Sequence, residues 1–473
     1  MGDSFDAVVV GAGPNGLTAA ARLARTGRRV IVFEGAPTVG GSTRTQELLA
    51  PGVRHDVGAA VVPFAALSPA FATLRLDLPL RHSPTPLAHA LDDGRAVAVA
   101  VERSLDATAA AFGADAARYR GVIRPFVEHI DALADASLGP ATRQARHPLI
   151  AARFAPLALA PVTTVARLFA TDEMRAVLVG LGAHATVAPD RALTGGVALM
   201  LLAALHAVGW PVVEGGTQVV AERLVEVVRA SGGEIVFGQR VASLRDLPPA
   251  PITMLDVTPR QFADLAPDAA PAYRRWRYGP GACKVDYVLS GPMPWTAAAC
   301  RDAATVHIGA SAAEIVAAEQ TVAAGQVPDR PYVIVVQPHV ADPTRQAASQ
   351  GGLLPLWAYC HVPSGCDIDV SATIETQLDR FAPGWRDLIV AKRVLTAAAS
   401  EATNPNLVGG DLAGGLMSVG QMLLGPRRGR SPYATNIDGV YLCSSSTPPG
   451  AGVHGMCGWH AASVALRRSH RRR

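Results

Sequence analysis

The chain opens with two short apolar runs that flank a stretch of helical periodicity. Ala7–Val10 and Val30–Phe33 are unbroken apolar runs, which predict buried strands. Between them, apolar residues recur at helical spacing from position 17 onward, and Gly27 predicts the end of that helix. The order strand, helix, strand predicts a parallel βαβ unit.

Farther along, helical and strand-like patterns alternate. Short β-rich runs fill 80–101, with a turn expected at Asp92, Asp93 and Gly94. Apolar periodicity predicts helices over 105–136, 138–209, 219–228, 374–381 and 455–468. Further β runs predict strands at 234–237, 252–257, 278–289, 305–308, 332–337, 354–362 and 440–443.

The turn after the first strand carries the pattern Gly11-x-Gly13-x-x-Gly16. Gly11 permits the tight turn, Gly13 lets the backbone close on a pyrophosphate, and Gly16 lets helix and strand pack closely. The helix start favours negative charge, and Glu34 ends the second strand near the spacing of an acid that binds a ribose. The unit predicts an ADP-ribose site; the alternative is a structural βαβ unit without nucleotide.

Composition gives the chain an apolar character. Apolar residues make up 49% and charged residues 17%, with a mean hydropathy of +0.22. A large core explains these values, and so does an apolar substrate cavity or a patch that contacts a membrane. The net charge of +4 is small for 473 residues, and no motif indicates nucleic acid. The basic residues at 467–473 predict a solvated tail or a contact with an anionic membrane.

The cysteines and the lack of a recognisable targeting segment bear on the cellular compartment of the protein. The six cysteines form no CxxC pair and no metal-ligand spacing, so we expect neither a disulfide framework nor a metal site. The first strand begins too near Met1 for a signal peptide, and the apolar run 195–210 is too short to span a bilayer. We expect a cytoplasmic protein, with peripheral contact to the inner membrane face as an alternative; the oligomeric state is left open.

Residues 39–45, Val-Gly-Gly-Ser-Thr-Arg-Thr, follow Glu34 within a few positions. This segment resembles the glycine doublet that follows the first βαβ unit in flavoproteins of the amine oxidase and phytoene desaturase superfamily, which NAD-only dehydrogenases do not usually carry. Two glycines allow the backbone to approach a cofactor, and Arg44 can offer donors to it. The resemblance favours FAD over NAD. Asp56 and Gly58 match a pattern that lies close to the flavin in the same family, although Asp56 could instead cap the next segment.

The last unit, residues 439–460, runs from a strand through a turn at Gly450 and Gly452 to a helix that opens at Gly455. The start of such a helix would favour the negative charge of a reduced flavin. From 6 to 468 the chain resembles an FAD-dependent oxidoreductase of the phytoene desaturase type, in the bacterial branch described as NAD(P)/FAD-dependent oxidoreductases. It departs from carotenoid desaturases at Ser444, Ser445 and Pro448, which argues against a carotenoid substrate.

The resemblance implies an α/β fold of two parts. A Rossmann-like FAD-binding domain is expected from 1–79, 210–272 and 405–473, and a discontinuous α+β substrate domain, a mixed sheet with helices, from 80–209 and 273–404. Val241 would hold the adenine through its backbone, and the serine hydroxyls after residue 443 could bind the ribityl chain or a phosphate. The expected cofactor-binding residues are Gly11, Gly13, Pro14, Asn15, Gly16, Glu34, Gly35, Gly40, Gly41, Ser42, Arg44, Gly58, Val241, Ser445, Gly450, Gly452, Val453, His454 and Gly455.

Lys284 and His454 are the candidate catalytic residues. The chain has only two lysines, so one inside an apolar strand is unexpected. The resemblance implies that Lys284 holds a water against flavin N5; the alternative is a buried lysine paired with a carboxylate such as Asp286. His454 could act as a general acid or base or donate a hydrogen bond to the flavin, or it could simply cap the helix at Gly455.

Three hypotheses for function follow. In the first, a hydride of an apolar small molecule passes to flavin N5, and oxygen or a quinone-like acceptor reoxidises the flavin. In the second, the reaction is amine oxidation or a redox-neutral double-bond isomerisation; Met456 and Trp459 stand where an amine oxidase would present aromatic side chains, which weakens the amine hypothesis. In the third, the chain is a flavin-binding scaffold without turnover.

Overall fold

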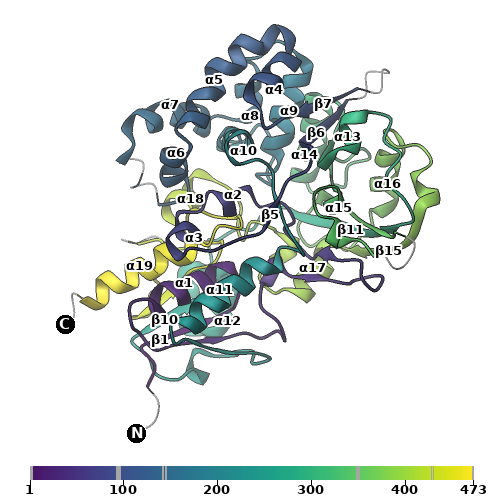
Figure 1. Cartoon of the computed structure of the whole chain (residues 1–473). Helices are drawn as coiled ribbons and strands as arrows, with labels where there is room; N and C mark the ends of the chain where they lie inside the picture. The colour runs from purple at the N-terminus through teal and green to yellow at the C-terminus, as the bar shows by residue number, and fades with distance from the viewer. Residues whose placement is uncertain are drawn as a thin grey trace.

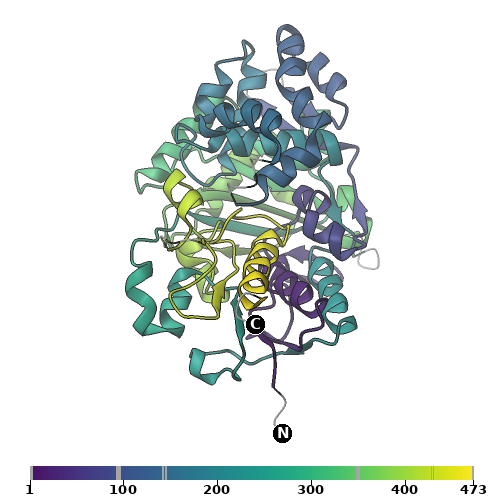
Figure 2. The same ribbon diagram turned by 90° about the vertical axis from the view of Figure 1, so that its left-hand side faces the viewer.

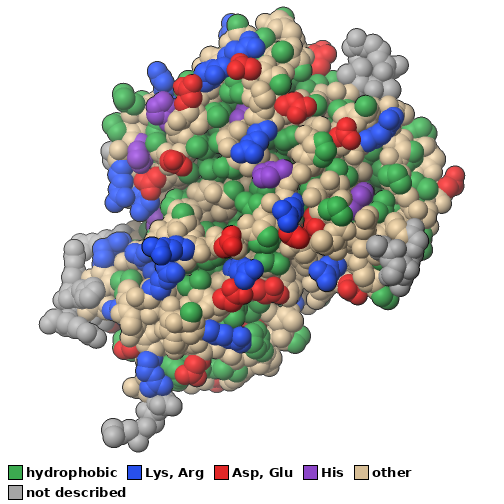
Figure 3. Space-filling view, viewed as in Figure 1, with side chains coloured by type: hydrophobic (Ala, Val, Ile, Leu, Met, Phe, Trp, Pro, Cys, Tyr) green, Lys and Arg blue, Asp and Glu red, His purple; other side chains and the backbone are tan. Residues whose placement is uncertain are grey.

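The computed structural model describes residues 4–91, 97–140, 143, 146–347, 352–427, 429 and 431–470. The turn expected at positions 92–94 lies outside these residues. Two sheets and a group of helices make up the described chain: a parallel sheet at the bottom of Figure 1, a mixed sheet to the right, and helices above both. On the face drawn in Figure 3, acidic and basic side chains are interspersed.

The parallel sheet brings together strands from the start, middle and end of the chain. Among the described residues it has five strands in the order β16 (Val440–Leu442), β10 (Ile252–Leu255), β1 (Ala7–Val10), β2 (Val30–Phe33) and β9 (Glu234–Val236). All four pairings are parallel. Because the carboxyl ends of parallel strands meet at one edge, the loops after β1, β10 and β16 lie together.

Successive side chains of these strands point to opposite faces of the sheet, and each face packs against its own layer of helices. One face of the sheet packs against α1 (Pro14–Ala24), α11 (Gln218–Ala230) and α19 (Met456–His470), and the last two flank the first. Figure 2 shows α19 lying beside α1. On the opposite face, Val10, Leu255 and Leu442 pack with α12 (Pro259–Leu265). The 3-10 turn after α12, η5 (Pro267–Tyr273), completes this layer.

The mixed sheet has seven strands within the described chain. Their order is β15 (Ile389–Leu395), β11 (Gly281–Leu289), β14 (Leu354–Val362), β13 (Val333–Val336), β12 (Ala303–Ile308), β6 (Thr85–Leu91) and β7 (Val97–Val101). The β12–β6 pair is parallel and the other pairs are antiparallel. Side chains alternate between the faces: Cys283, Val285 and Tyr287 pack in a core with Trp385, while Lys284 lies on the opposite face.

A cap of helices covers that opposite face, as Figure 1 shows. The cap helices are α4 (Leu105–Ala111), α5 (Ala116–Glu128), α6 (Ile130–Ser137), α7 (Pro148–Leu159), α8 (Val162–Ala166), α9 (Asp172–Ala183) and α10 (Thr194–Val208). The predicted helical stretches 105–136 and 138–209 are thus confirmed as helical but divided into several helices. Pro148, Pro161 and Pro189 lie at or between helix ends, because proline cannot donate the hydrogen bond that a continuing helix needs.

Short elements join these layers. They are the hairpin strands β3 (Thr45–Gln46) with β4 (His55–Asp56), the pair β5 (Leu80–Arg81) with β8 (Val212–Val213), and the helices α2 (Pro63–Ala66), α3 (Pro69–Leu74), α13 (Ala298–Arg301), α14 (Ala312–Ala323), α15 (Pro338–Ala341), α16 (Ser371–Asp379), α17 (Ala397–Thr403) and α18 (Val419–Leu424). In the part of the chain that the structure describes, no helix is long and apolar enough to cross a membrane. The predicted α/β fold, with a Rossmann-like parallel sheet and a mixed sheet carrying helices, is confirmed.

Candidate active site

A cavity of about 1500 Å³ runs from the carboxyl edge of the parallel sheet to the cap helices. Its wall at the sheet edge contains Gly11, Gly13, Gly41, Gly450 and Gly452. Glycine-bearing segments near the two ends of the chain therefore line one hollow, and Val241 from the middle of the chain lines it too. The other end of the cavity reaches α6, α7 and α10 and the face of the mixed sheet that carries Lys284.

The glycine turn after β1 is held by close backbone packing. Gly11 has a φ of +96°, a region that side chains disfavour. A Cβ on Gly16 would overlap the carbonyl oxygen of Gly11, and one on Gly458 would overlap the carbonyl oxygen of Asn15. The first contact lets α1 begin directly after the turn, and the second lets α19 lie against the start of α1. Gly458 was not singled out by its sequence, because its role depends on a distant helix.

Glu34 lies where the sequence places it, in the cavity wall just after β2. Its two carboxylate oxygens accept hydrogen bonds from the backbone N–H of Ala12 (2.7 Å) and of Ala36 (2.8 Å). Gly35 and Val241 line the same part of the cavity. The acid is therefore fixed between the glycine turn and the loop after β2, with its side chain at the cavity surface.

The glycine doublet packs directly against the first turn. Gly40 N donates to the carbonyl oxygen of Ala12 at 2.9 Å, and Arg44 Nε donates to the carbonyl oxygen of Gly41 at 3.0 Å. A Cβ on Gly58 would lie 2.5 Å from the carbonyl oxygen of Ser42. Gly41, Ser42, Arg44 and Gly58 line the cavity, whereas Gly16, Gly40 and Gly455 lie behind its wall. These three glycines permit close packing of the loops that form the wall.

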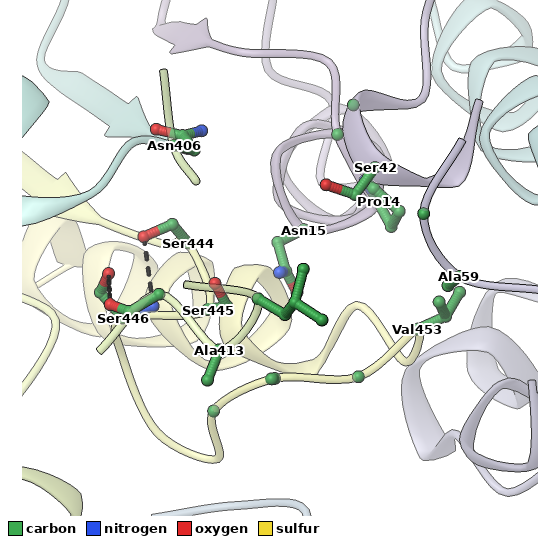
Figure 4. A pocket seen from close by; sticks show the side chains of 18 of the residues that line it. Pro14, Asn15, Ser42, Ala59, Asn406, Ala413, Ser444, Ser445, Ser446 and Val453 are labelled. Atoms are coloured by element: carbon green, nitrogen blue, oxygen red, sulfur yellow. Dashed lines mark hydrogen bonds between the residues drawn. The ribbon is translucent and has the colours of Figure 1, made fainter. Parts of the chain in front are cut away.

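The last segment completes the wall on the opposite side. In Figure 4, Ser444, Ser445 and Ser446 from this segment and Pro14 and Asn15 from α1 surround the same hollow. The hydroxyls of Ser444 and Ser446 donate to the carbonyl oxygens of Val257 (2.7 Å) and Gly414 (2.6 Å). Ser445 also lines the cavity, as do Pro14, Asn15 and Val453.

His454 lies in the cavity wall and caps α19. Its Nδ1 accepts a hydrogen bond from Met456 N at 3.0 Å, so the capping alternative is what the geometry shows. Nε2 therefore carries the proton of the neutral ring, and within the described chain it has no hydrogen-bond partner. Burial lowers the pKa of His454 to about 4, against a smaller opposing effect of the Ala451 and Gly450 carbonyls. The ring is neutral near pH 7.

Lys284 is almost fully buried, forms an ion pair, and lines the cavity. Its side chain is 9% exposed, and Nζ forms an ion pair with Asp286, as the alternative prediction states. Nζ also donates to the carbonyl oxygen of Asp56 at 3.1 Å and lies 4.8 Å from the centre of the Trp357 ring. Lys284, Asp286 and Trp357 all line the cavity. The ammonium group is thus positioned by three neighbours at the boundary between the glycine end and the cap.

Asp56 joins the short β3–β4 hairpin to the rest of the molecule. Its carboxylate pairs with the buried Arg345 and accepts hydrogen bonds from Thr45 Oγ1 (2.7 Å) and Thr217 N (3.0 Å). Thr217 precedes α11, so Asp56 caps a helix far along the chain. Asp56 does not line the cavity, whereas Gly58 does.

Asp256 is a site residue that the sequence reasoning missed. It follows β10, lines the cavity, and accepts a hydrogen bond from Gly16 N at 2.9 Å. Burial raises its pKa to about 7, and the neighbouring charge of Glu34 adds to this effect. Its position at the end of a predicted strand was the only signal, because the strand order is needed to show that β10 neighbours β1 and so places Asp256 beside the glycine turn. Asn406 fixes it further by donating from Nδ2 to the carbonyl oxygen of Asp256 at 3.0 Å.

The far end of the cavity is a mainly apolar chamber under the cap. Its wall comes from helices and from one face of the mixed sheet, and its apolar members are Leu133, Leu138, Ile150, Phe154, Val197, Met200, Leu201, Ile334, Val336 and Trp357. The few polar side chains include His184, Thr305 and Tyr359. His184 Nε2 lies 3.2 Å from His307 Nε2, and burial lowers the pKa of His184 to about 4. Among the described residues that line the chamber, the charged side chains are the Lys284–Asp286 pair and Arg393 at its sheet side.

Comparisons with known proteins agree with this architecture. Residues 9–72 match the family described as NAD(P)-binding Rossmann-like domain. A rat protein called pyridine nucleotide-disulfide oxidoreductase domain-containing protein 2 is 24% identical over 98% of this chain and 93% of its own length. The mouse protein of the same name is 35% identical over 91 residues, which are 19% of this chain and 16% of that protein.

Two solved structures share the fold along almost the whole chain. An oxidoreductase from Methanosarcina mazei has a TM-score of 0.61 at 15% identity, covering 98% of this chain and 99% of that one. A variant of putrescine oxidase has a TM-score of 0.61 at 18% identity, with the same coverage. The chain therefore shares the fold of these two proteins over almost its whole length, and its first βαβ region matches an NAD(P)-binding Rossmann-like domain.

Proposed function

We propose that this chain is an FAD-dependent dehydrogenase or desaturase that acts on an apolar small molecule. The observation that carries the proposal is the continuity of the cavity, which joins the glycine turns to an apolar chamber in about 1500 Å³. Sites for one small ligand usually measure roughly 300–1,000 Å³. The cavity is thus large enough for a dinucleotide and a substrate together.

The residues at the glycine end fit a bound FAD. A Cβ on Gly11 would lie 3.1 Å from the backbone oxygen of Asp256, and one on Gly13 would lie 2.6 Å from Asp256 Oδ2, so the wall here has to remain backbone. Two buried polar atoms in this wall, Asn15 Oδ1 and His454 Nε2, have no protein partner within the described chain, so they are free to bind a ligand. The wall from 450 to 454 supports FAD over a nicotinamide dinucleotide, because it extends the site beyond the first βαβ unit.

Each part of the chain would have a distinct task in holding the cofactor. The backbone N–H groups of Gly13 and Asn15 would bind the pyrophosphate, and Glu34 would accept hydrogen bonds from the adenosine ribose. Ser445 and Arg44 would donate to the ribityl chain or a phosphate. His454 would donate through Nε2, because its low pKa and its capping bond keep it neutral with the proton on that atom.

At the boundary with the chamber, Lys284 would position a water or a polar atom beside the substrate. Its contacts with Asp286 and Asp56 hold the ammonium group in place, and the apolar walls exclude other water. Bound FAD would supply the chemistry, accepting a hydride at N5 and passing the electrons to oxygen or a quinone-like acceptor. The chain's own contribution is to bind, orient and desolvate the reacting C–H group.

The test is spectroscopic. Purified protein is expected to show flavin absorbance, and anaerobic addition of an apolar substrate is expected to bleach it. Protein that is colourless and cannot be loaded with FAD would reject the proposal. Bleaching by amines with release of hydrogen peroxide would select amine oxidation. Activity that requires prereduced flavin, with no net electron flow, would select isomerisation. Bound flavin that no candidate substrate reduces would favour a flavin-binding scaffold without turnover.

Amine oxidation is the second candidate, because the fold is shared with putrescine oxidase. The aromatic side chain of the last segment does not favour it: Trp459 is covered by the Arg22 guanidinium, 3.8 Å from the ring centre, and does not line the cavity. Trp357 and Tyr359 do line the cavity, with ring centres 5.8 Å apart and tilted by 32°. This pair offers aromatic faces to an amine substrate.

A further inference from the structure

Helix α7 is apolar on both of its faces although it lies at the surface. Eleven of its twelve residues are apolar, and Arg153 is the exception. One side of the helix, including Ile150 and Phe154, lines the chamber. On the other side Leu149 is 83% exposed and Leu159 is 53% exposed. A helix that is apolar all round is normally buried in a protein core or in a membrane, so the outer face of α7 lacks a partner.

Helix α18 has the same property on the other side of the cavity mouth. Its sequence is Val-Gly-Gln-Met-Leu-Leu, and none of its residues is buried. Leu423 is 58% exposed and Leu424 is 43% exposed, yet Val419, Met422 and Leu423 also line the cavity. Figure 1 shows α7 and α18 on the same side of the molecule. Of the ten large apolar side chains that are exposed among the described residues, five lie on these two helices.

Arginines predominate in the sequence around the two helices, although Asp135 of α6 pairs with Arg143 and His147 just before α7. Residues 138–171, which contain α7, and residues 412–437, which contain α18, have no Asp or Glu and seven arginines between them. At the chain's overall frequency these 60 positions would hold about five acidic residues. Arg146 and Arg153 are exposed beside Leu149. Exposed leucines with exposed arginines next to them are typical of a surface that binds anionic lipid.

We propose that α7 and α18 together form a docking surface for the anionic face of a lipid bilayer, with the mouth of the cavity opening onto the acyl region. The exposed leucines would enter the boundary between headgroups and acyl chains, and Arg146 and Arg153 would contact lipid phosphates. An apolar substrate could then pass from the bilayer to the chamber without crossing water. This last step rests on the proposed function, whereas the docking itself does not.

Vesicle flotation of the full chain tests the docking. The wild-type protein is expected to float with vesicles of phosphatidylglycerol and phosphatidylcholine, and at least tenfold less with phosphatidylcholine alone. The double variant Leu149→Glu/Leu423→Glu is expected to lose at least tenfold of the bound fraction. The control Ile368→Glu places the same charge at a leucine-sized side chain that is 57% exposed outside the two helices, and is expected to float like the wild type. Arg153→Gln is expected to weaken binding to the anionic vesicles alone.

Three results would overturn the docking proposal. Wild-type protein that floats with neither vesicle would do so, and so would a double variant that floats as well as the wild type. The surface would instead bind a second copy of the chain if the wild type were a dimer, the double variant were a monomer, and neither protein bound vesicles. Thermal midpoints and flavin content show whether each variant is folded. Loss of oxidation with intact flotation would count against the proposed function alone.

Discussion

The glycine end of the cavity and the chamber under the cap are parts of one hollow, but they differ in what forms the wall. At the glycine end the wall is mostly backbone, and a single added Cβ on Gly16 would overlap a neighbouring carbonyl group. In the chamber the wall is side chain, contributed by alternate residues of the mixed sheet and by the inner sides of α6, α7 and α10. The first region constrains residue identity at each position, and the second constrains only apolar character and volume.

This difference indicates where substitutions should affect the cofactor and where they should affect the substrate. Backbone contacts at the glycine end cannot adjust to an added side chain, so changes there should abolish cofactor binding. Chamber residues can be exchanged for others of similar size, so changes there should alter affinity for the substrate and leave the cofactor bound. The Lys284–Asp286 pair lies between the two regions and should affect both.

The largest effect is expected for Gly16→Val. The new side chain would overlap the Gly11 carbonyl and meet Asp256, so the turn must open and the cofactor site is lost. We expect flavin binding to weaken at least ~10-fold, measured as flavin absorbance per protein after loading with FAD. Gly121→Ala is the matched control, because a Cβ there meets nothing within 4 Å in the middle of α5. Wild-type flavin content in Gly16→Val would disprove the assignment of the turn.

The next effect is expected for Lys284→Met, which leaves Asp286 buried without its cation. Breaking a buried ion pair in this way costs about 3–5 kcal/mol, so the free energy of unfolding should fall by that amount. The control is Lys392→Met at the only other lysine, which is 43% exposed and pairs with Glu375. Glu375 is buried but also pairs with Arg386, so it keeps a cation when the half-exposed Lys392 is removed. That loss should cost about 1 kcal/mol or less, and chemical denaturation should separate the two variants.

The double variant Lys284→Met/Asp286→Leu distinguishes a structural role from a functional one. Replacing both charges by apolar groups often restores stability, so folding and flavin content should recover. If the rate of flavin bleaching by a substrate stays low in this stable protein, Lys284 acts on the reaction. A rate equal to that of the wild type would show that the pair only holds β11 to the β3–β4 hairpin.

Much of the glycine end could be predicted from the sequence, because its chemistry depends on residues at fixed spacing. The turn from Gly11 to Gly16, Glu34 and the doublet at Gly41 each lie in the cavity wall or directly behind it. Most of the longer strands and the cap helices follow from apolar periodicity, whereas β15 and α14 were not predicted. Prolines mark the boundaries around α7, α8 and α10, but Pro156 lies inside α7. Contacts between distant segments could not be predicted from the sequence. The hydrogen bond from Gly16 to Asp256 and the packing of Gly458 on Asn15 both depend on the order of the strands and helices.

Asp256→Asn should change how stability depends on pH. The folded protein raises the pKa of Asp256 to about 7, whereas an unfolded Asp has a pKa of about 3.9. Between these values the folded state holds a proton that the unfolded state has released, so this group makes the cofactor-free protein less stable as pH rises from ~4 to ~7. Asn cannot titrate and retains an oxygen for Gly16 N. We expect the variant to lose about 2 kcal/mol less stability than the wild type between pH ~5 and pH ~8, measured by urea unfolding.

The neighbouring acid provides the check on that prediction. Because the charge of Glu34 adds to the raised pKa of Asp256, Glu34→Gln should reduce the same pH dependence by a smaller amount. Identical pH profiles for the wild type and Asp256→Asn would show that Asp256 is ionised throughout this range. The wall of the glycine end would then contain a second permanent negative charge beside the expected pyrophosphate.

The smallest effect on the protein is expected in the chamber, for Phe154→Ala. Phe154 is half-buried on α7, packs edge-to-face on Phe126 with ring centres 5.5 Å apart, and lines the cavity. The ring pair contributes about 0.5–1.5 kcal/mol beyond the burial of its area, and because Phe154 is only half-buried the total cost should stay below the roughly 3–5 kcal/mol of a fully buried phenylalanine. Flavin content should equal that of the wild type, while the enlarged chamber should change KM among apolar substrates of different size. Phe237→Ala, at an exposed phenylalanine outside the cavity, should change neither. A loss of flavin in Phe154→Ala would remove the distinction between the two regions, because it would mean that the side chains of the chamber also hold the cofactor.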